Sequence, residues 1–108
     1  MKLLACEQVH WHDCVIQSVL VLPEASEIEL RVEYPMDWEA NQFELATIRL
    51  LNAFGYKEYE EPFAGAPTIL RATSEPQAGG HHLLRIETNA GYREVFCSAI
   101  SLELTAES

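Results

Sequence analysis

The chain has 108 residues, of which 48% are hydrophobic and 22% are charged. This length predicts a single domain over residues 1–108, and the composition is that of a globular protein rather than a disordered one. Seventeen acidic residues against seven basic ones give a net charge of -10. Such a charge repels nucleic-acid phosphates and anionic lipid headgroups, so we expect no nucleic-acid and no membrane partner. It attracts basic proteins instead.

The three cysteines, Cys6, Cys14 and Cys97, are irregularly spaced and odd in number. A disulfide framework needs paired cysteines, so this pattern favours free thiols in a reducing compartment. No stretch reaches the roughly 18 apolar residues of a membrane-spanning helix. We therefore expect a cytoplasmic protein.

The first two predicted strands form a hairpin. Residues 14–22, CVIQSVLVL, are rich in β-branched side chains and stop before Pro23. Residues 27–34, EIELRVEY, alternate strictly, which is typical of a half-buried strand. The apolar face of this second strand consists of Ile28, Leu30, Val32 and Tyr34.

The middle of the chain has two interpretations. One is a helix from about Trp38 to Phe54, which the strong helix formers in this stretch favour. The other is a loop to Gln42, followed by a strand in which Ala46, Ile48 and Leu50 alternate with polar residues. We favour the strand, because both neighbouring segments are strands of similar length.

Four further strands are predicted in the second half. They are Gly55–Glu61, an edge strand ended by Pro62, then Thr68–Thr73, Leu83–Thr88 and a last strand over residues 92–104. A loop of Asn89, Ala90 and Gly91 joins the last two as a hairpin. Short strands at about ten-residue spacing predict an all-β fold: an antiparallel β-sandwich or open barrel of six to seven strands. The alternative is an α+β fold with one helix near 38–54.

The stretch HWHDC, residues 10–14, is a candidate metal site. If it is extended, His10, His12 and Cys14 point the same way, and zinc or another transition metal accepts imidazole and thiolate together. His81, His82 or Cys97 could supply a third ligand. The other interpretation is a polar strand start, where histidine and aspartate cap turns. We favour the second and expect no cofactor.

Two aromatic-bearing segments are candidate partner-binding loops: YPMDWEANQF, residues 34–43, and EEPFAGAPT, residues 60–68. Aromatic side chains among acids can hold an arginine or lysine of a partner. The partner-binding candidates are Tyr34, Asp37, Trp38 and Glu39. No G-x-S-x-G elbow or glycine-rich phosphate loop accompanies them, so catalysis has no sequence support.

The strand opening WHDCVIQSVLVL, followed by a turn and IELRVEY, resembles small bacterial mostly-β domains of unknown function. It is similar to immunity proteins of polymorphic toxin systems, in which FHDAEV-like strand starts recur. The pattern carries over to Trp11, His12 and Asp13, whereas Cys14 stands where a small residue is usual. The resemblance implies a cytosolic, non-enzymatic domain that binds another protein.

We therefore expect a small acidic cytosolic protein-binding domain without catalytic activity, immunity-like, with a basic partner. The acid-rich stretch from Glu24 to Glu44 is the expected surface. One alternative is a metal-binding protein or metal-dependent enzyme that uses His10 and His12. Another is a structural homodimer that buries an unpaired strand edge.

Overall fold

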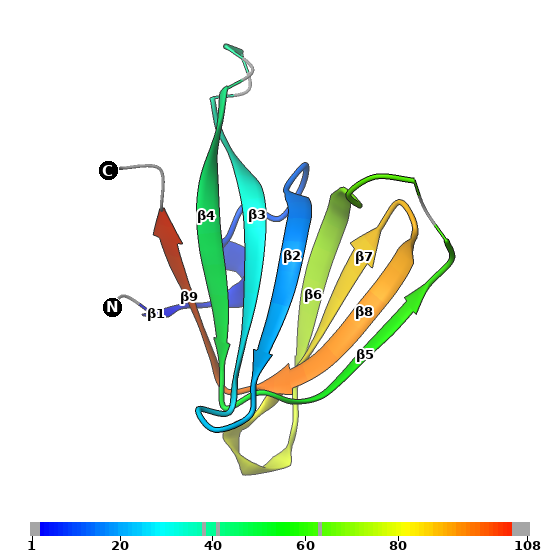
Figure 1. Cartoon of the computed structure of the whole chain (residues 1–108). Helices are drawn as coiled ribbons and strands as arrows, with labels where there is room; N and C mark the ends of the chain where they lie inside the picture. The colour runs from blue at the N-terminus through cyan, green and yellow to red at the C-terminus, as the bar shows by residue number, and fades with distance from the viewer. Residues whose placement is uncertain (1–2, 38, 41, 63, 105–108) are drawn as a thin grey trace.

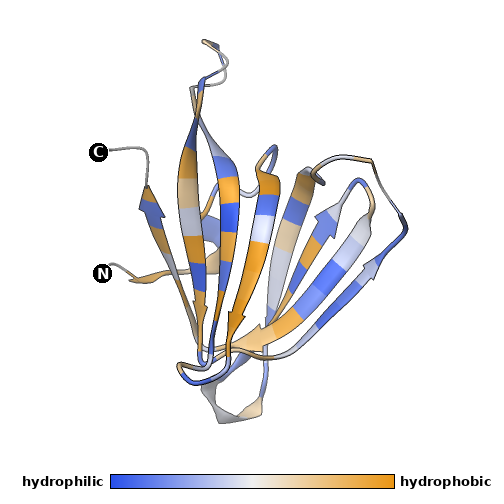
Figure 2. Ribbon diagram, viewed as in Figure 1, coloured by the Kyte–Doolittle hydropathy of each residue, from blue (hydrophilic) through white to orange (hydrophobic). Residues whose placement is uncertain are grey.

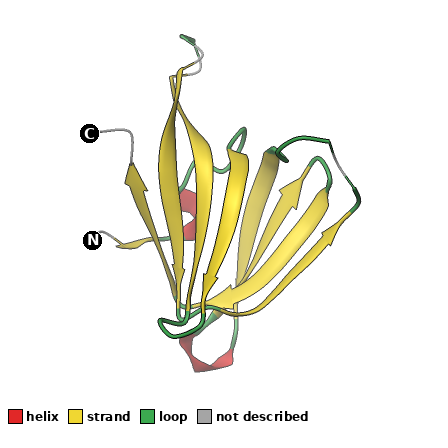
Figure 3. Ribbon diagram, viewed as in Figure 1, coloured by secondary structure: helices red, strands yellow, loops and turns green. Residues whose placement is uncertain are grey.

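The computed structural model describes residues 3–37, 39–40, 42–62 and 64–104, without the side chain of Asp37. Strands dominate the described residues, with only two single-turn helices between them (Figure 3). No helix there is long and apolar enough to cross a membrane. The elements are β1 Leu3–Leu4, η1 Cys6–Gln8, β2 Val15–Leu22, β3 Glu27–Asp37, β4 Gln42–Leu51, β5 Phe54–Glu60, β6 Ile69–Pro76, η2 Ala78–Gly80, β7 His82–Thr88, β8 Gly91–Cys97 and β9 Ala99–Leu104.

The strands form two antiparallel sheets (Figure 1). Sheet A has the order β1-β9-β4-β3-β2, and sheet B has the order β5-β8-β7-β6. The sheets lie close where β4 continues into β5 and β8 into β9, and they diverge toward the opposite end. The prediction of an all-β antiparallel sandwich is thus confirmed, in an arrangement that does not close.

The core lies between the two sheets and follows the alternation of the strands. Apolar and polar residues alternate along β3 and β4 in Figure 2, and the apolar set faces sheet B. Because successive side chains of a strand point to opposite faces, this alternation defines one buried face. The largest fully buried side chains are Leu30, Ile48, Leu50, Ile69, Leu84 and Ile86.

The middle segment is a strand, as we favoured. β4 pairs with β3 along its length, with Ala46 opposite Val32 and Ile48 opposite Leu30. The alternative helix near 38–54 is wrong. Helix propensity is a weak local preference, and the pairing of β4 with both β3 and β9 overrides it.

The last strand is not continuous, which corrects the prediction over residues 92–104. The chain leaves sheet B after Cys97, bends at Ser98 and enters sheet A as β9. The Ser98 amide donates to the Leu51 carbonyl at 2.9 Å, and Asn52 donates to the Ser98 hydroxyl at 2.7 Å. The bend reverses the alternation, so that Phe96 packs outside against Phe54 instead of facing the core.

Candidate functional site

The stretch His10–Cys14 is a turn rather than an extended strand. Asp13 has a φ of 74°, so the three candidate ligands do not alternate on one face. Cys14 is fully buried and its thiol donates to the His10 carbonyl at 3.1 Å. The His12 ring is exposed, with Nδ1 2.9 Å from the Leu70 carbonyl oxygen. The condition under which His10, His12 and Cys14 would point the same way, an extended stretch, is therefore not met.

The candidates for a third ligand lie elsewhere. His81 packs edge-on against Phe54, with 5.1 Å between ring centroids. His82 and Cys97 line a pocket of about 470 Å³ beside the N-terminal segment, together with Cys6. Among the described residues, no three histidine, cysteine, aspartate or glutamate side chains are grouped so that they could hold a metal ion.

The buried cysteines are in protonated form. Burial, with a smaller effect of the Asp13 charge, raises the pKa of Cys14 to about 12. Burial, with a smaller effect of Cys6, raises the pKa of Cys97 to about 11. Because the thiolate is the nucleophile and metal ligand, these thiols are poorly suited to either role at neutral pH.

The four partner-binding candidates differ in their surroundings. Tyr34 is only 9% exposed, and its hydroxyl accepts a hydrogen bond from the His10 amide at 2.9 Å. Its ring is part of the core, so little of its surface is open to a partner, and its role in partner binding stays a prediction. Glu39 is exposed. Trp38 and the Asp37 side chain lie outside the described residues, as does Phe63 of the second candidate loop.

The β3–β4 hairpin projects beyond the rest of sheet A (Figure 1). The pairing of β2 with β3 ends at Glu33, and that of β9 with β4 ends at Ala46. The described residues of this segment, 34–37, 39–40 and 42–45, are here called the arm, in which Tyr34 pairs with Glu44 and Asp37 with Gln42. The arm exposes the apolar side chains of Met36, Phe43 and Leu45.

The outer surface of sheet A next to the arm is acidic. Glu27, Glu29 and Glu33 share the outer face of β3, and Glu103 of β9 lies on the same side. We call these four glutamates the acidic face. Two arginines, Arg31 and Arg49, lie on the same face. Arg49 donates to Glu29 at 3.1 Å and to Glu103 at 2.7 Å.

A polar cluster that the sequence analysis did not single out lies on the inner face of β5 and β8. Arg93 is 6% exposed and donates to the two carboxylate oxygens of Glu60, at 2.7 and 2.9 Å. Glu60 also accepts a hydrogen bond from the Thr88 hydroxyl at 3.0 Å. The buried guanidinium thus has a bidentate carboxylate partner, the strongest geometry for such a pair.

Tyr56 and Glu58 extend this cluster toward solvent. Arg93 donates to the Tyr56 hydroxyl at 3.0 Å, and Tyr56 donates to Glu58 at 2.6 Å. Burial raises the pKa of Tyr56, and its hydrogen bond to Glu58 raises it further. Burial alone would raise the pKa of Glu60, but the hydrogen bonds and charge of Arg93 outweigh burial and lower it. The cluster therefore joins one guanidinium to two carboxyl groups.

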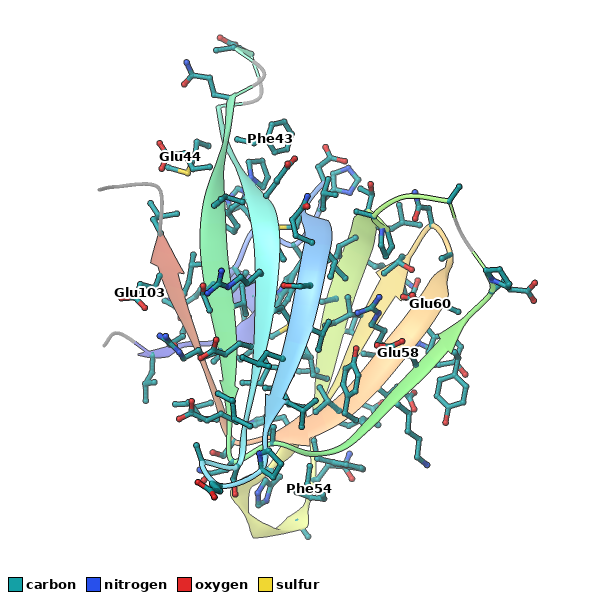
Figure 4. All side chains as sticks on the ribbon, viewed as in Figure 1. Phe43, Glu44, Phe54, Glu58, Glu60 and Glu103 are labelled. Atoms are coloured by element: carbon teal, nitrogen blue, oxygen red, sulfur yellow. The ribbon has the colours of Figure 1, made fainter. Side chains whose placement is uncertain are left out.

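A pocket of about 380 Å³ separates this cluster from β2, and we call it the edge slot. Figure 4 shows Glu58 and Glu60 on the β5 side of the space between the sheets. The slot is lined by Ile16, Gln17, Ser18, Val19, Glu58, Gly65, Ala66, Pro67 and Arg93.

One signal in the sequence pointed to the cluster. Tyr56, Glu58 and Glu60 alternate in the predicted edge strand, so they had to share a face. Their side chains could lie on the inner face of the sheet only because Arg93 pairs with Glu60 there. The two residues are 33 positions apart along the chain. That pairing follows from sheet topology, which residue spacing does not reveal.

Comparison with protein-family models, curated proteins and solved structures found no match to this chain. The resemblance to immunity proteins therefore rests on the sequence of Trp11, His12 and Asp13, which precede β2.

Proposed function

We propose that this protein is a protein-binding domain without catalytic activity that recognises a basic partner through the arm and the acidic face. The observation that carries the proposal is the arm itself, a ribbon that projects beyond sheet A and exposes Met36, Phe43 and Leu45. A projecting apolar group beside charged residues has the composition of an interface core with a polar rim.

The two parts of this surface would act at different stages of binding. The acidic face steers a basic partner during approach, because complementary charge raises the association rate. The apolar side chains of the arm then supply the contact area that holds the complex, since a few well-packed anchors carry most of the binding energy. Arg31 and Arg49 lie among the four glutamates, so the acidic face keeps more acidic than basic side chains.

A finer proposal concerns the class of partner. The similarity of the sequence at residues 11–13 to that of immunity proteins supports a cytosolic protein that neutralises a toxin. A dense acidic surface suits a basic nuclease, because carboxylates can occupy the positions of nucleic-acid phosphates. In this finer proposal, the protein acts in the cytoplasm and its partner there is a basic toxin.

Capture from the native host tests the proposal. The tagged protein and a Phe43→Ser/Leu45→Ser variant are used as baits at low salt, and retained proteins are compared by quantitative mass spectrometry. We expect a basic protein that the variant loses and that salt well above about 0.15 M releases, because salt screens exposed charges. A retained set that is identical for both baits would contradict the proposal. A toxin gene beside this gene would support the finer proposal, and an unrelated neighbourhood would count against it.

A further inference from the structure

The edge of β2 is unlike the other sheet edges. Its first residues are covered, since the Ile16 amide donates to the Pro67 carbonyl at 2.9 Å and Val15 bridges to Thr68. Beyond them, among the described residues, no strand lies beside β2 on the side away from β3. Leu20 and Val21 there are each 52% exposed.

Natural sheets protect their edges with charge, proline or short length. β1 has only two residues, β5 carries Lys57 and two glutamates, and β6 carries Arg71 and ends at Pro76. β2, VIQSVLVL, has no charged residue and no proline. Its exposed edge is therefore a ready template for another strand.

The edge slot lies along this edge and is bounded on its other side by sheet B. A strand added to β2 would lie over the inner face of β5 and β8, and every second side chain would point into the slot. The β2 side of the slot is lined by the apolar Ile16 and Val19 and the polar Gln17 and Ser18. Glu58 and Arg93 give the opposite wall its charges.

The charges in the slot favour a cation at one of these inward positions. Arg93 already donates to Glu60 and Tyr56, and its Nη1 is 3.6 Å from Glu58. Glu58 is the second carboxylate of a cluster with one guanidinium, and its side chain is 47% exposed. A lysine or arginine side chain beside Glu58 would balance the excess charge, whereas an acidic side chain would be repelled.

We propose that the open edge of β2 binds an extended segment of a partner protein, which adds to sheet A as a further strand and places a lysine or arginine beside Glu58. Main-chain hydrogen bonds would give affinity, and the inward side chains specificity, as in other cases of strand addition. A second copy of this chain fits less well, because its own β2 offers only uncharged side chains to Glu58. The inference goes beyond the proposed function, since the slot is separate from the arm.

Selection from a random peptide library tests the inference without a known partner. A phage library of peptides of about ten residues, long enough for one strand, is panned on the intact protein. We expect enriched peptides to lack proline, to carry β-branched residues at alternate positions and to share one lysine or arginine. Failure to enrich any peptide, or enrichment of acidic peptides, would overturn the inference.

Matched variants then locate the binding. Glu58→Gln should weaken the selected peptide by about tenfold, whereas Glu94→Gln, which removes the same charge from the outer face of β8, should change its affinity less than about twofold. Likewise Val21→Lys, on the inner face of β2 that Val19 shares, should weaken binding more than Leu20→Lys on the outer face. Equal effects within either pair would overturn the inference.

Hydrogen exchange separates strand addition from other modes. Bound peptide should increase protection of the amides in residues 17–22 and leave those of β6 unchanged, and an unchanged β2 would overturn the inference. Sedimentation of the protein alone provides the last check: a dimer abolished by Val21→Lys would make a second copy the occupant and overturn the inference. Loss of peptide binding in the arm variant Phe43→Ser/Leu45→Ser is not expected, so the two proposals fail separately.

Discussion

Arg93 and Glu60 form a bidentate ion pair between two neighbouring strands of sheet B, at 2.7 and 2.9 Å, with both side chains largely buried. A buried charge is costly unless it is paired and hydrogen-bonded. Glu60 and Tyr56 accept hydrogen bonds from the Arg93 guanidinium, and Thr88 donates one to Glu60. These bonds satisfy a guanidinium at the open side of the sandwich, where a closed sandwich would have apolar contacts. Stability and the chemistry of the edge slot therefore depend on the same residues.

Removing one partner of this pair should destabilise the protein strongly. Glu60→Ala leaves the Arg93 guanidinium without its carboxylate, and breaking a buried pair in this way costs about 3–5 kcal/mol. Denaturant unfolding monitored by circular dichroism measures the change. The double variant Glu60→Leu/Arg93→Met, which leaves neither charge, should be less destabilised than Glu60→Ala alone. A cost for Glu60→Ala below about 0.5 kcal/mol, the range of surface substitutions, would contradict the role of the pair.

The same pair should make stability depend on acid. The pKa of Glu60 is lower in the folded protein than its ordinary value of about 4.3. The stabilisation that ionised Glu60 gives the fold is therefore complete above its ordinary pKa. It is lost as the pH falls through the lowered pKa of the folded protein. Unfolding free energies measured from about pH 6 down to about pH 3 should fall less steeply for Glu60→Gln than for the unchanged protein. Glu87, whose pKa Arg71 lowers by a hydrogen bond, contributes to both curves and cancels in the difference. Parallel curves would contradict the prediction.

Gly91 should not tolerate a side chain. Its φ is 152°, and a Cβ at this position would collide with the backbone of Tyr59 in β5. Gly91→Ala should therefore cost well over about 1 kcal/mol, because the strand or the turn must move. Gly80→Ala is the control, since Gly80 also has a positive φ (82°) but nothing lies within 4 Å of its added Cβ. Equal unfolding free energies for the two variants would show that the close approach of β5 has no cost.

Cys14 and Cys97 should resist alkylation in the folded protein. Burial raises the pKa of these thiols to about 12 and about 11, so almost none of either is thiolate at pH 8. Iodoacetamide labelling followed by mass spectrometry should modify both cysteines in denaturant and neither in the native protein over the same time. Rapid native labelling of Cys14 would contradict its buried position.

Sequence alternation predicted the strands well but predicted the turns and long-range pairings poorly. The alternation of β3 and the context of β4 were sufficient, since period-two patterns define a buried face. The bend at Ser98 was missed because apolar residues continue on both sides of it, so nothing in the local pattern marks the passage between sheets. The turn at Asp13 was missed because the left-handed conformation is uncommon outside glycine, although aspartate tolerates it better than most residues.

The candidate site residues show the same difference between local patterns, which the sequence reveals, and long-range pairings, which it does not. The acids of β3 were read directly from the sequence, because exposed charges on an alternating strand need no tertiary information. Tyr34 lies in the core, as its place on the apolar face of the alternating strand predicts, and its assignment to partner binding stays a prediction. The Arg93 cluster required knowledge of which strands pair, and no spacing in the sequence contains that knowledge.

The measurement that tests the central claim most directly is the affinity of the captured basic partner for two matched variants. Leu45→Ser removes an exposed leucine of the arm, and Leu70→Ser removes a leucine of similar exposure from β6 (51% and 46% exposed). Calorimetric titration should show Leu45→Ser weakened by at least about tenfold, as expected for an interface anchor worth more than about 1.4 kcal/mol, with Leu70→Ser unchanged. Equal affinities for both variants would contradict binding through the arm.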